Sequence, residues 1–222
     1  MRTLLNRLPV FPIMTPFNQF PLRRVFLFIA GALGLLLIAS LGDSWAYTYL
    51  NLPHVYDQNW GRLLRVIGWL PFWVLAGVAL YRSATTLLAR RHAIILIGSP
   101  TLSGAMSELL KLIIRRERPG PNAGSYVFRG FAEHTFSTAG LGMPSGDATV
   151  AFAACVVAAR LWPRARGIWY GLAIGCALAR VLSHAHFLSD VTAAAILGSV
   201  VADALWRRYA FPANTDAVVT ST

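Results

Sequence analysis

Charged residues are scarce in this sequence. Only 13% of its 222 residues are Asp, Glu, Lys or Arg, whereas a soluble domain of this length carries about 25%. Cysteine occurs twice, and Cys155 and Cys176 lie inside apolar segments without the spacing of a disulfide framework or a metal site. This composition excludes a disordered chain, a disulfide scaffold and a coiled coil. The charge is too little to cover a globular surface in water, so we expect an integral membrane protein.

Long apolar runs dominate instead, and 56% of the residues are hydrophobic. Six runs reach or approach the ~20 residues that cross a bilayer as a helix. They are Val25–Leu41, Leu63–Tyr81, Ala93–Ile114, Ala148–Trp162, Ile168–Leu182 and Val191–Trp206. The first is longer than the apolar core of a cleaved signal peptide, roughly 7–15 residues, so we expect it to be retained. The sequence thus predicts an all-α fold, a six-transmembrane-helix bundle over residues 25–208, between an N-terminal interfacial segment (1–24) and a C-terminal tail (209–222).

Basic residues are almost all arginine: Lys111 is the only lysine among 20, and the net charge is +11. They lie in short clusters between the apolar runs rather than on one soluble face, which argues against nucleic-acid binding. With a cytoplasmic N-terminus, 12 basic residues fall inside and 8 outside, as the positive-inside rule prefers. Six of the outer eight lie in three short stretches, at Lys111–Arg118, Arg129 and Arg180. Cations that oppose this rule near helix ends indicate an anion site.

The first of three polar clusters is Lys111-x6-Arg118-Pro119, at the outer end of the third predicted helix. Positions i, i+4 and i+7 share a helix face, so we expect Lys111, Arg115 and Arg118 to point the same way. Pro119 is expected to end the helix, because it has no backbone N–H to continue it. Three cations on one face repel each other unless an anion binds among them. The alternative is that these side chains snorkel to lipid headgroups.

The second cluster, Pro144-Ser145-Gly146-Asp147, immediately precedes the fourth predicted helix. The free N–H groups at the start of a helix form a ready site for phosphate oxygens. The alternative is that Ser145 or Asp147 simply caps the helix.

The third cluster is Arg180-x5-His186-x3-Asp190, around the start of the sixth predicted helix. In a helix, the carboxylate of Asp190 could accept a hydrogen bond from one imidazole nitrogen of His186. The other nitrogen would then be free as a nucleophile or base. The alternative is a purely structural His–Asp pair. All three clusters fall on the same side of the membrane, which favours a site at the outer membrane–water interface.

Taken in this order, Lys-x6-Arg-Pro, Pro-Ser-Gly and Arg-x5-His-x3-Asp resemble the signature of the type 2 phosphatidic acid phosphatase (PAP2) superfamily, over roughly residues 111–190. The resemblance implies a phosphatase that needs neither metal nor cofactor. His186 would attack phosphorus and form a phosphohistidine, and Asp190 would orient it. The phosphoryl oxygens would be held by Lys111, Arg118, Ser145, Gly146 and Arg180. Fixed cations and amides suit a transition state whose charge lies on the equatorial oxygens.

Two positions depart from the family pattern. Ala179 stands where the family usually has a serine, which removes a hydroxyl beside Arg180. Asp147 stands where the family usually has a histidine that protonates the leaving oxygen. An Asp has an ordinary pKa of about 3.9, and a helix N-terminus with nearby arginines favours its ionised form. Three resolutions are open: Asp147 is protonated when a phosphate dianion arrives, His184 or His134 supplies the proton, or the leaving group is acidic enough to need little help, as in a lipid diphosphate.

The residues Gly146-Asp147-Ala148 and the run from His186 to Val191 resemble the lipid A 4'-phosphatase branch more than members with Pro-Ser-Gly-His. We therefore expect an enzyme of the bacterial inner membrane whose periplasmic site removes phosphate from lipid A or a related phosphoglycolipid. Its partners would be the membrane and this phosphorylated lipid. In the long segment between the third and fourth predicted helices, Arg129, Glu133 and His134 could contact a large headgroup. The alternative is a solvated loop whose charges are incidental.

Alternative functions stay open. Within the same class, the substrate could be undecaprenyl diphosphate or phosphatidylglycerophosphate. From another class, the chain could be a non-catalytic anionic-lipid binder or a transporter. The inactive binder stays open because Asp147 stands where the family has its proton-donating histidine. A transporter would be expected to show broken helices or repeated halves near mid-membrane, whereas the polar residues here gather at one face.

Overall fold

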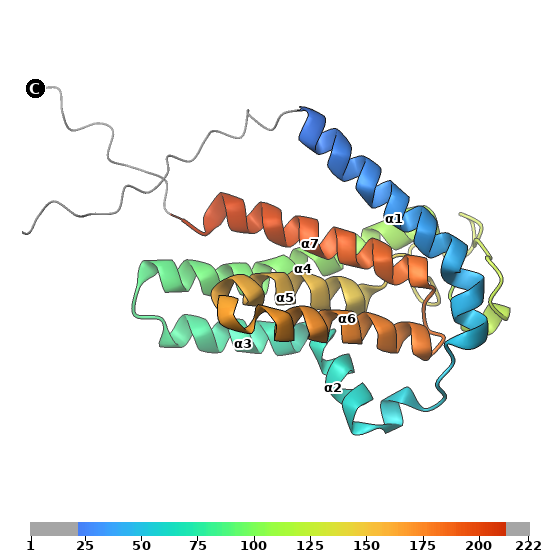
Figure 1. Cartoon of the computed structure of the whole chain (residues 1–222), viewed down its shortest axis with the longest axis horizontal. Coiled ribbons are helices and arrows are strands. Elements are labelled where there is room, and N and C mark those ends of the chain that lie inside the picture. The colour runs from blue at the N-terminus through green and yellow to red at the C-terminus, as the bar shows by residue number, and fades with distance from the viewer. Residues whose placement is uncertain (1–21, 212–222) are drawn as a thin grey trace, which may run out of the picture. The chain divides into compact units, whose positions relative to one another are not determined.

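The computed structural model describes residues 22–211, which are helical apart from turns, connections and two isolated β-bridges. The helices are α1 (Leu22–Tyr49), α2 (Asn59–Ile67), α3 (Leu70–Ser83), α4 (Leu87–Ile114), α5 (Gly146–Leu161), α6 (Arg166–Leu182) and α7 (Leu188–Tyr209) (Figure 1). The prediction of an all-α fold is confirmed. Most of the predicted interfacial segment and tail, residues 1–21 and 212–222, lies outside the described residues.

The chain divides after Gly34 into two compact units. The described part of the first unit is the beginning of α1, where large apolar side chains such as Phe26, Leu27 and Phe28 are exposed. An apolar helix with exposed apolar side chains is what a lipid-facing span requires. Because α1 begins at Leu22, Arg23 and Arg24 belong to this helix rather than to a preceding segment.

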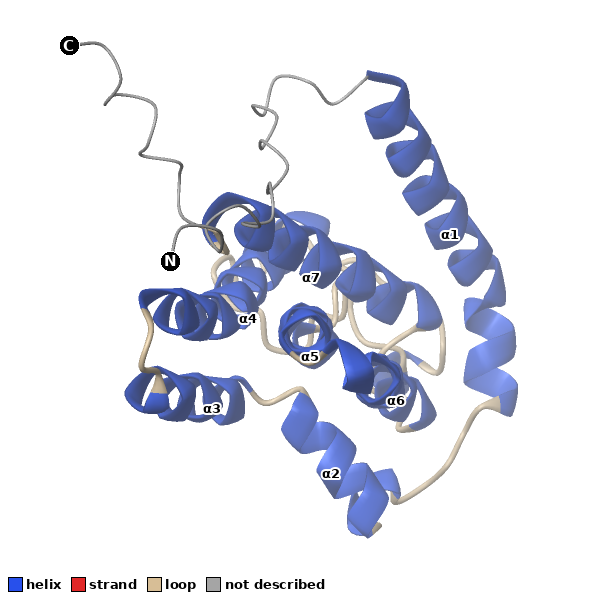
Figure 2. Ribbon diagram, turned by 60° about the vertical axis from the view of Figure 1, so that its left-hand side comes forward, coloured by secondary structure: helices blue, strands red, loops and turns tan. Residues whose placement is uncertain are grey.

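The second unit, from Leu35 onward, is a helix bundle built around α5 (Figure 2). α5 packs against α4, α6 and α7, and α3 packs against α4. The buried residues of α5 are almost all alanine, valine or cysteine, which lets neighbouring backbones approach closely, as in membrane bundles. Gly198 of α7 marks a close approach to α5, since a Cβ there would lie 2.5 Å from the Thr149 carbonyl oxygen and 2.9 Å from the Ala153 nitrogen.

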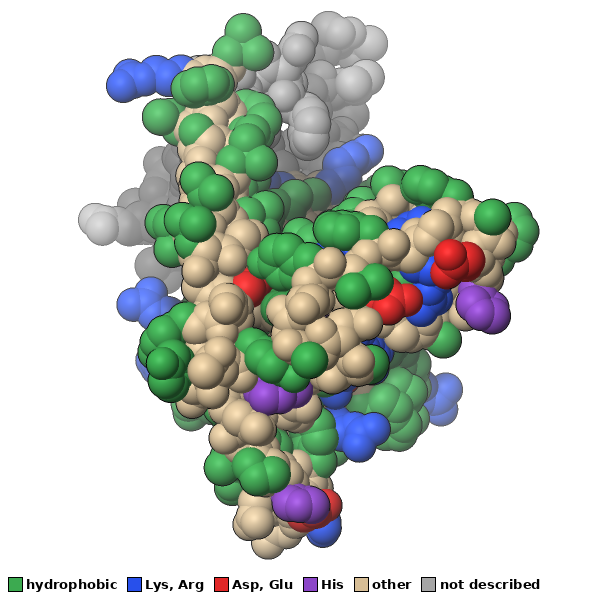
Figure 3. All heavy atoms as spheres, turned by 90° about the vertical axis from the view of Figure 1, so that its right-hand side faces the viewer, with side chains coloured by type: hydrophobic (Ala, Val, Ile, Leu, Met, Phe, Trp, Pro, Cys, Tyr) green, Lys and Arg blue, Asp and Glu red, His purple; other side chains and the backbone are tan. Residues whose placement is uncertain are grey.

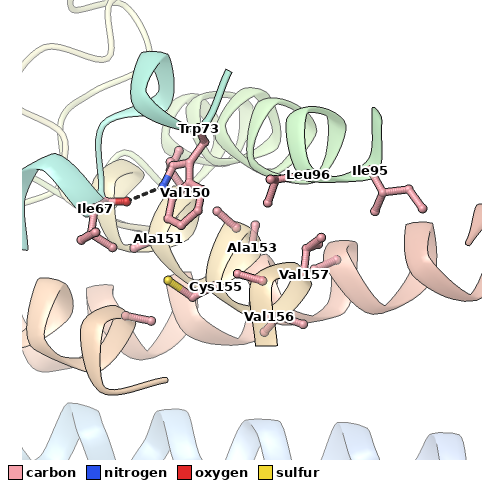
Figure 4. Close-up of a cluster of buried hydrophobic side chains, with 14 of the residues drawn as sticks. Ile67, Trp73, Ile95, Leu96, Val150, Ala151, Ala153, Cys155, Val156 and Val157 are labelled. Carbon is pink, nitrogen blue, oxygen red and sulfur yellow. Dashed lines mark hydrogen bonds between the residues drawn. The ribbon is translucent and has the colours of Figure 1, made fainter. Parts of the chain in front are cut away.

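The predicted helix Leu63–Tyr81 is wrong as a single element, because the chain breaks between α2 and α3 with a bend of 66°. Gly68 ends α2, and Pro71 lies in the first turn of α3, where its missing N–H is harmless. The Trp73 indole donates to the Ile67 carbonyl at 2.7 Å and thereby satisfies the freed end of α2 (Figure 4). Gly68 packs tightly, since a Cβ there would lie 2.7 Å from Asp147 Cβ.

Among the described residues, four helices are long and apolar enough to cross a membrane, and the bent pair α2–α3 could make a fifth span. These apolar helices indicate a membrane protein. At 16 residues, α5 is shorter than a full crossing, and its neighbours cover it from lipid. The six-span count therefore stays a prediction.

The packing of α5 on α7 generates a test at Gly198. Gly198→Ala places a methyl group against two backbone atoms that cannot move aside, so we expect it to lower the free energy of unfolding by about 1–3 kcal/mol. The matched control is Gly171→Ala in α6, where a Cβ meets nothing within 4 Å and helix propensity favours alanine by about 1 kcal/mol. Thermal unfolding in detergent measures both. Equal stability of the two variants would contradict this packing.

Candidate active site

The ends of four helices meet at one end of the bundle: α4 and α6 finish there, and α5 and α7 begin there (Figure 1). Seen from that side, Lys, Arg, Asp, Glu and His side chains lie among hydrophobic ones (Figure 3). The three polar clusters predicted from the sequence belong to these ends. Contacts between them bring most of the predicted residues together.

His186 lies in the short connection between α6 and α7 and is 3% exposed. Its Nδ1 is 3.4 Å from Asp190 Oδ2, an electrostatic contact that is longer than an ordinary N–H···O hydrogen bond. Burial lowers the pKa of His186 below its usual range, with Arg180 and Arg118 acting in the same direction and Asp190 opposing them. The imidazole is therefore neutral near pH 7, which is the form that a nucleophile requires.

Asp190 lies in the first turn of α7 and is fully buried. Its Oδ2 accepts a hydrogen bond from the Phe187 backbone N–H at 2.9 Å, which caps the helix. Its Oδ1 accepts one from Arg116 Nη2. The same Arg116 nitrogen donates to Ser189 Oγ at 2.7 Å. Both oxygens of the carboxylate are thus engaged.

Asp43 of α1 is a second buried carboxylate beside this group. It accepts hydrogen bonds from the Ser189 N–H at 2.8 Å and from the Tyr126 hydroxyl at 2.6 Å. Its Oδ2 is 3.9 Å from Arg116 Nη1. Burial and the bond to Asp43 raise the pKa of Tyr126 to about 12. Asp43 and Arg116 were not predicted as site residues. The sequence does carry one sign of Asp43, because an isolated carboxylate that directly follows a long apolar run is often functional.

Lys111 is nearly buried in the last turn of α4, and its Nζ is 2.5 Å from Glu108 Oε1. The start of α5 lies against it, because a Cβ on Gly146 would be 3.4 Å from Lys111 Nζ. The Ser145 N–H donates to the Asp190 carbonyl at 3.2 Å. Ser145 Oγ is buried and has no hydrogen-bond partner among the described residues.

Arg118 and Arg180 are two further cations at the end of the bundle where the four helices meet. Burial and the nearby charge of Arg180 lower the pKa of Arg118, and nearby carboxylates oppose this shift. Arg180, in the last turn of α6, pairs with Asp147 Oδ2 at 3.1 Å. An ion pair requires the carboxylate form of Asp147, which is the wrong form for a general acid. The backbone of His186 also reaches this region, since its N–H donates to the Arg180 carbonyl at 3.2 Å.

Tyr56 supplies a hydroxyl beside Arg180, where Ala179 lacks one. It lies in the 3-10 turn η2 (Val55–Asp57). Its hydroxyl accepts from Arg180 Nη1 at 3.2 Å and donates to the Ala179 carbonyl at 3.4 Å. The guanidinium also lies over the Tyr56 ring, 5.8 Å from its centroid. Sequence reasoning missed this residue, because it is more than 120 positions away along the chain.

The predicted common face of Lys111, Arg115 and Arg118 is wrong, because α4 ends at Ile114. Arg115 adopts a left-handed conformation with φ of 58°, and Pro119 does not end the helix. The Arg115 side chain holds the following segment instead. It donates to the carbonyls of Arg129, Gly130 and Glu133 at 3.0, 2.8 and 2.5 Å. One guanidinium thus binds three carbonyls of this segment at once and supplies five donors to do so.

The two auxiliary histidines lie differently. His184 stacks on Tyr47 with ring centroids 4.2 Å apart and shares a small crevice with Asp43 and His186. His134 is exposed in a turn of the segment 115–145, in a left-handed conformation. Arg129 pairs with Glu117 at 3.1 Å. Among the described residues, no group of three or more His, Cys, Asp or Glu side chains could hold a metal ion.

Comparison with protein families gives one match: the PAP2 superfamily, over residues 92–212. The chain belongs to this superfamily, and its activity is of the phosphatase type on phosphorylated substrates. Searches of curated proteins and of solved structures found no match. The resemblance to the lipid A 4'-phosphatase branch stays a prediction. Asp43 and Tyr56 both lie before the matched residues.

The contact between Tyr56 and Arg180 allows a test of whether Tyr56 supplies the hydroxyl that Ala179 lacks. Tyr56→Phe removes a hydrogen bond to a charged group, worth about 1.5 kcal/mol, so we expect kcat/KM for phosphate release to fall about tenfold. Adding Ala179→Ser should restore part of this loss by returning a hydroxyl to Arg180. Tyr170→Phe, the same change at an exposed position of α6, is the control and should leave kcat/KM unchanged. Equal activity of Tyr56→Phe and the control would refute the bracing role.

Proposed function

We propose that this protein is a membrane lipid phosphatase that cleaves a phosphomonoester or diphosphate of a lipid, preferably lipid A, through a phosphohistidine on His186. The observation that carries the proposal is the buried, neutral His186 beside Asp190, at the helix ends that also carry Lys111, Arg118 and Arg180. A neutral imidazole near Arg118 and Arg180, at the end of the bundle that also carries Lys111, suits attack on a phosphate group.

The reaction would proceed in two displacements. His186 Nε2 attacks phosphorus, the bond from phosphorus to the lipid oxygen breaks, and the lipid leaves with a proton. Water then attacks the phosphohistidine, the P–N bond breaks, and inorganic phosphate leaves. Asp190 stabilises the imidazolium-like charge through Nδ1. Lys111, Arg118 and Arg180 would neutralise the equatorial oxygens, together with the unpartnered Ser145 hydroxyl and the Gly146 N–H at the start of α5.

The proton for the leaving oxygen is the step that Asp147 complicates, because this carboxylate pairs with Arg180. A phosphate dianion that takes the place of Asp147 on Arg180 would leave this partly exposed carboxylate beside a dense negative charge. Such a charge favours protonation of Asp147, which could then donate to the leaving oxygen. His184 as the donor, or a diphosphate substrate that needs no donor, are the alternatives.

A lipid substrate is supported by the surroundings of the site. The segment 115–145 carries exposed phenylalanines, Phe128, Phe131 and Phe136, which are apolar side chains that can insert at the boundary between headgroups and acyl chains. The motif residues Gly146-Asp147-Ala148 favour lipid A and, with it, a bacterial inner membrane. The arginine distribution favours a site on the side away from the cytoplasm, which in that membrane is the periplasm. Undecaprenyl diphosphate and phosphatidylglycerophosphate remain the alternative substrates, and a non-catalytic anionic-lipid binder is the alternative of another class.

The test is phosphate release by purified protein in detergent with a chelator present. Lipid A, undecaprenyl diphosphate and phosphatidic acid are offered separately. We expect release from lipid A that persists in chelator and vanishes in His186→Ala. The control is His54→Ala, which removes an exposed histidine that pairs with Asp57 and should leave release unchanged. Release that persists in His186→Ala, or that needs a metal, would contradict the mechanism, and release from another lipid would reassign the substrate.

A second expectation concerns the pH dependence of His186. Because burial lowers its pKa, His186 stays neutral as the pH falls below the ordinary value of about 6.5, and becomes protonated only at the lowered pKa. Diethyl pyrocarbonate reacts with neutral imidazole, so its rate of reaction at His186, measured by mass spectrometry, reports this pKa without substrate. We expect half-maximal reactivity below pH 6.5, with the unfolded protein as reference. A midpoint at or above the reference would contradict the assignment.

A further inference from the structure

Three charged side chains are buried together where α1, the end of α4 and the start of α7 meet. Asp43 is 1% exposed, Arg116 5% and Asp190 0%. Removing a charge from water costs several kcal/mol unless a partner compensates it. A single arginine therefore serves two carboxylates in a region of low dielectric. The inference below rests on the proposed function, because it assigns a role to this group through His186.

Ser189 connects the two carboxylates. Its hydroxyl accepts a hydrogen bond from Arg116 Nη2 at 2.7 Å and donates one to Asp43 Oδ2. Its backbone N–H donates to Asp43 Oδ1 at 2.8 Å. Arg116 can only donate hydrogen bonds and a carboxylate can only accept them, so the Ser189 hydroxyl must accept from Arg116 and donate to Asp43. The position of Asp43 is thus transmitted to Arg116 through one serine.

The guanidinium of Arg116 also contacts two aromatic rings. Its Cζ lies 5.0 Å from the ring centroids of both Tyr126 and Phe187. Aromatic faces attract a cation and exclude water from it. The Tyr126 hydroxyl is in turn bonded to Asp43, so the aromatic contact and the ionic contact depend on the same residues.

These contacts bear on the orientation of the Asp190 carboxylate. Arg116 occupies Oδ1, which leaves Oδ2 for the Phe187 N–H and for His186 Nδ1. We propose that Arg116 and Asp43 are positioning residues: acting through Ser189, they fix the rotation of the Asp190 carboxylate so that Oδ2 faces His186. Asp43 lies in α1, which precedes the residues matched by the PAP2 superfamily.

Arg116 also affects the electrostatic environment of His186. Its cation offsets part of the negative charge of Asp190, and so limits how strongly Asp190 favours protonation of the imidazole. The other charged or titratable groups around His186 are Arg118, Arg180, Asp43, Tyr47 and His184. Loss of the Arg116 charge should therefore raise the pKa of His186, whereas loss of its geometry alone should not.

Two substitutions separate these effects. Arg116→Lys keeps the charge but lacks the planar fork, and Arg116→Gln removes the charge. The matched control is Arg160→Lys: Arg160 pairs with Asp203 of α7, at the other end of the helix that carries Asp190. Folding is followed by thermal unfolding and size-exclusion chromatography, and kcat and KM by phosphate release.

We expect Arg116→Lys to lower kcat about 10- to 100-fold, the cost of misplacing a reacting group by about 1 Å, with KM changed less than about twofold. The pH midpoint of diethyl pyrocarbonate reaction at His186 should stay unchanged in this variant. In Arg116→Gln the midpoint should rise by roughly half a pH unit or more. Asp43→Asn should lower kcat in the same direction, and its effect should not add to that of Arg116→Lys. Arg160→Lys should retain kcat.

A structural role alone predicts different results. It predicts that Arg116→Lys loses activity only in proportion to lost folded protein, and that the pH midpoint of His186 is the same in Arg116→Gln and wild type. Either result would overturn the proposal, as would wild-type kcat in folded Arg116→Lys. If Arg116→Gln does not fold, Ser189→Ala breaks the same link without burying an unpaired charge, and its kcat should fall with KM retained. Absence of phosphate release by the wild-type protein would reject the proposed function, and the titration of His186 would still decide whether Arg116 acts on it.

Discussion

The pairing of buried charges is the constraint on which this end of the molecule depends. Arg116 stands between Asp43 and Asp190, and all three side chains are buried. Apolar packing is non-directional and brings helices close without fixing their ends. A buried ion group has stricter requirements, because a misplaced partner leaves an uncompensated charge. The end of α4, the start of α7 and the part of α1 around Asp43 are therefore held together by these contacts, and the orientation of Asp190 follows.

The small residues of α5 make this arrangement possible. Its alanines and valines allow α4, α6 and α7 to surround one central helix, so that the end of α4 and the end of α6 both reach the start of α5. Gly146 then lies against Lys111, and Asp147 pairs with Arg180. Cations from two different helices are thus placed around free N–H groups of a third, an arrangement suited to a phosphate group.

The sequence predicts the all-α fold and the meeting of the three polar clusters, because apolar run length and the side of the membrane can be read directly from the order of residues. It does not predict Arg116, Asp43 or Tyr56, since their importance comes from contacts between distant positions. The expectation for Arg115 is wrong because a helix-face argument needs the helix to continue, and α4 ends one residue earlier. The break between α2 and α3 also depends on a tertiary contact, the bond from Trp73 to Ile67.

The central claim is that His186 carries the phosphoryl group. The most direct measurement is to mix the protein with lipid A bearing a labelled phosphate, quench within one turnover in alkali, and locate the label by mass spectrometry. A phosphohistidine is stable in alkali and labile in acid, so we predict label on the peptide containing His186, lost on acid treatment and absent in His186→Ala. Phosphate release with no labelled protein at any quench time, or label that survives acid, would contradict the account.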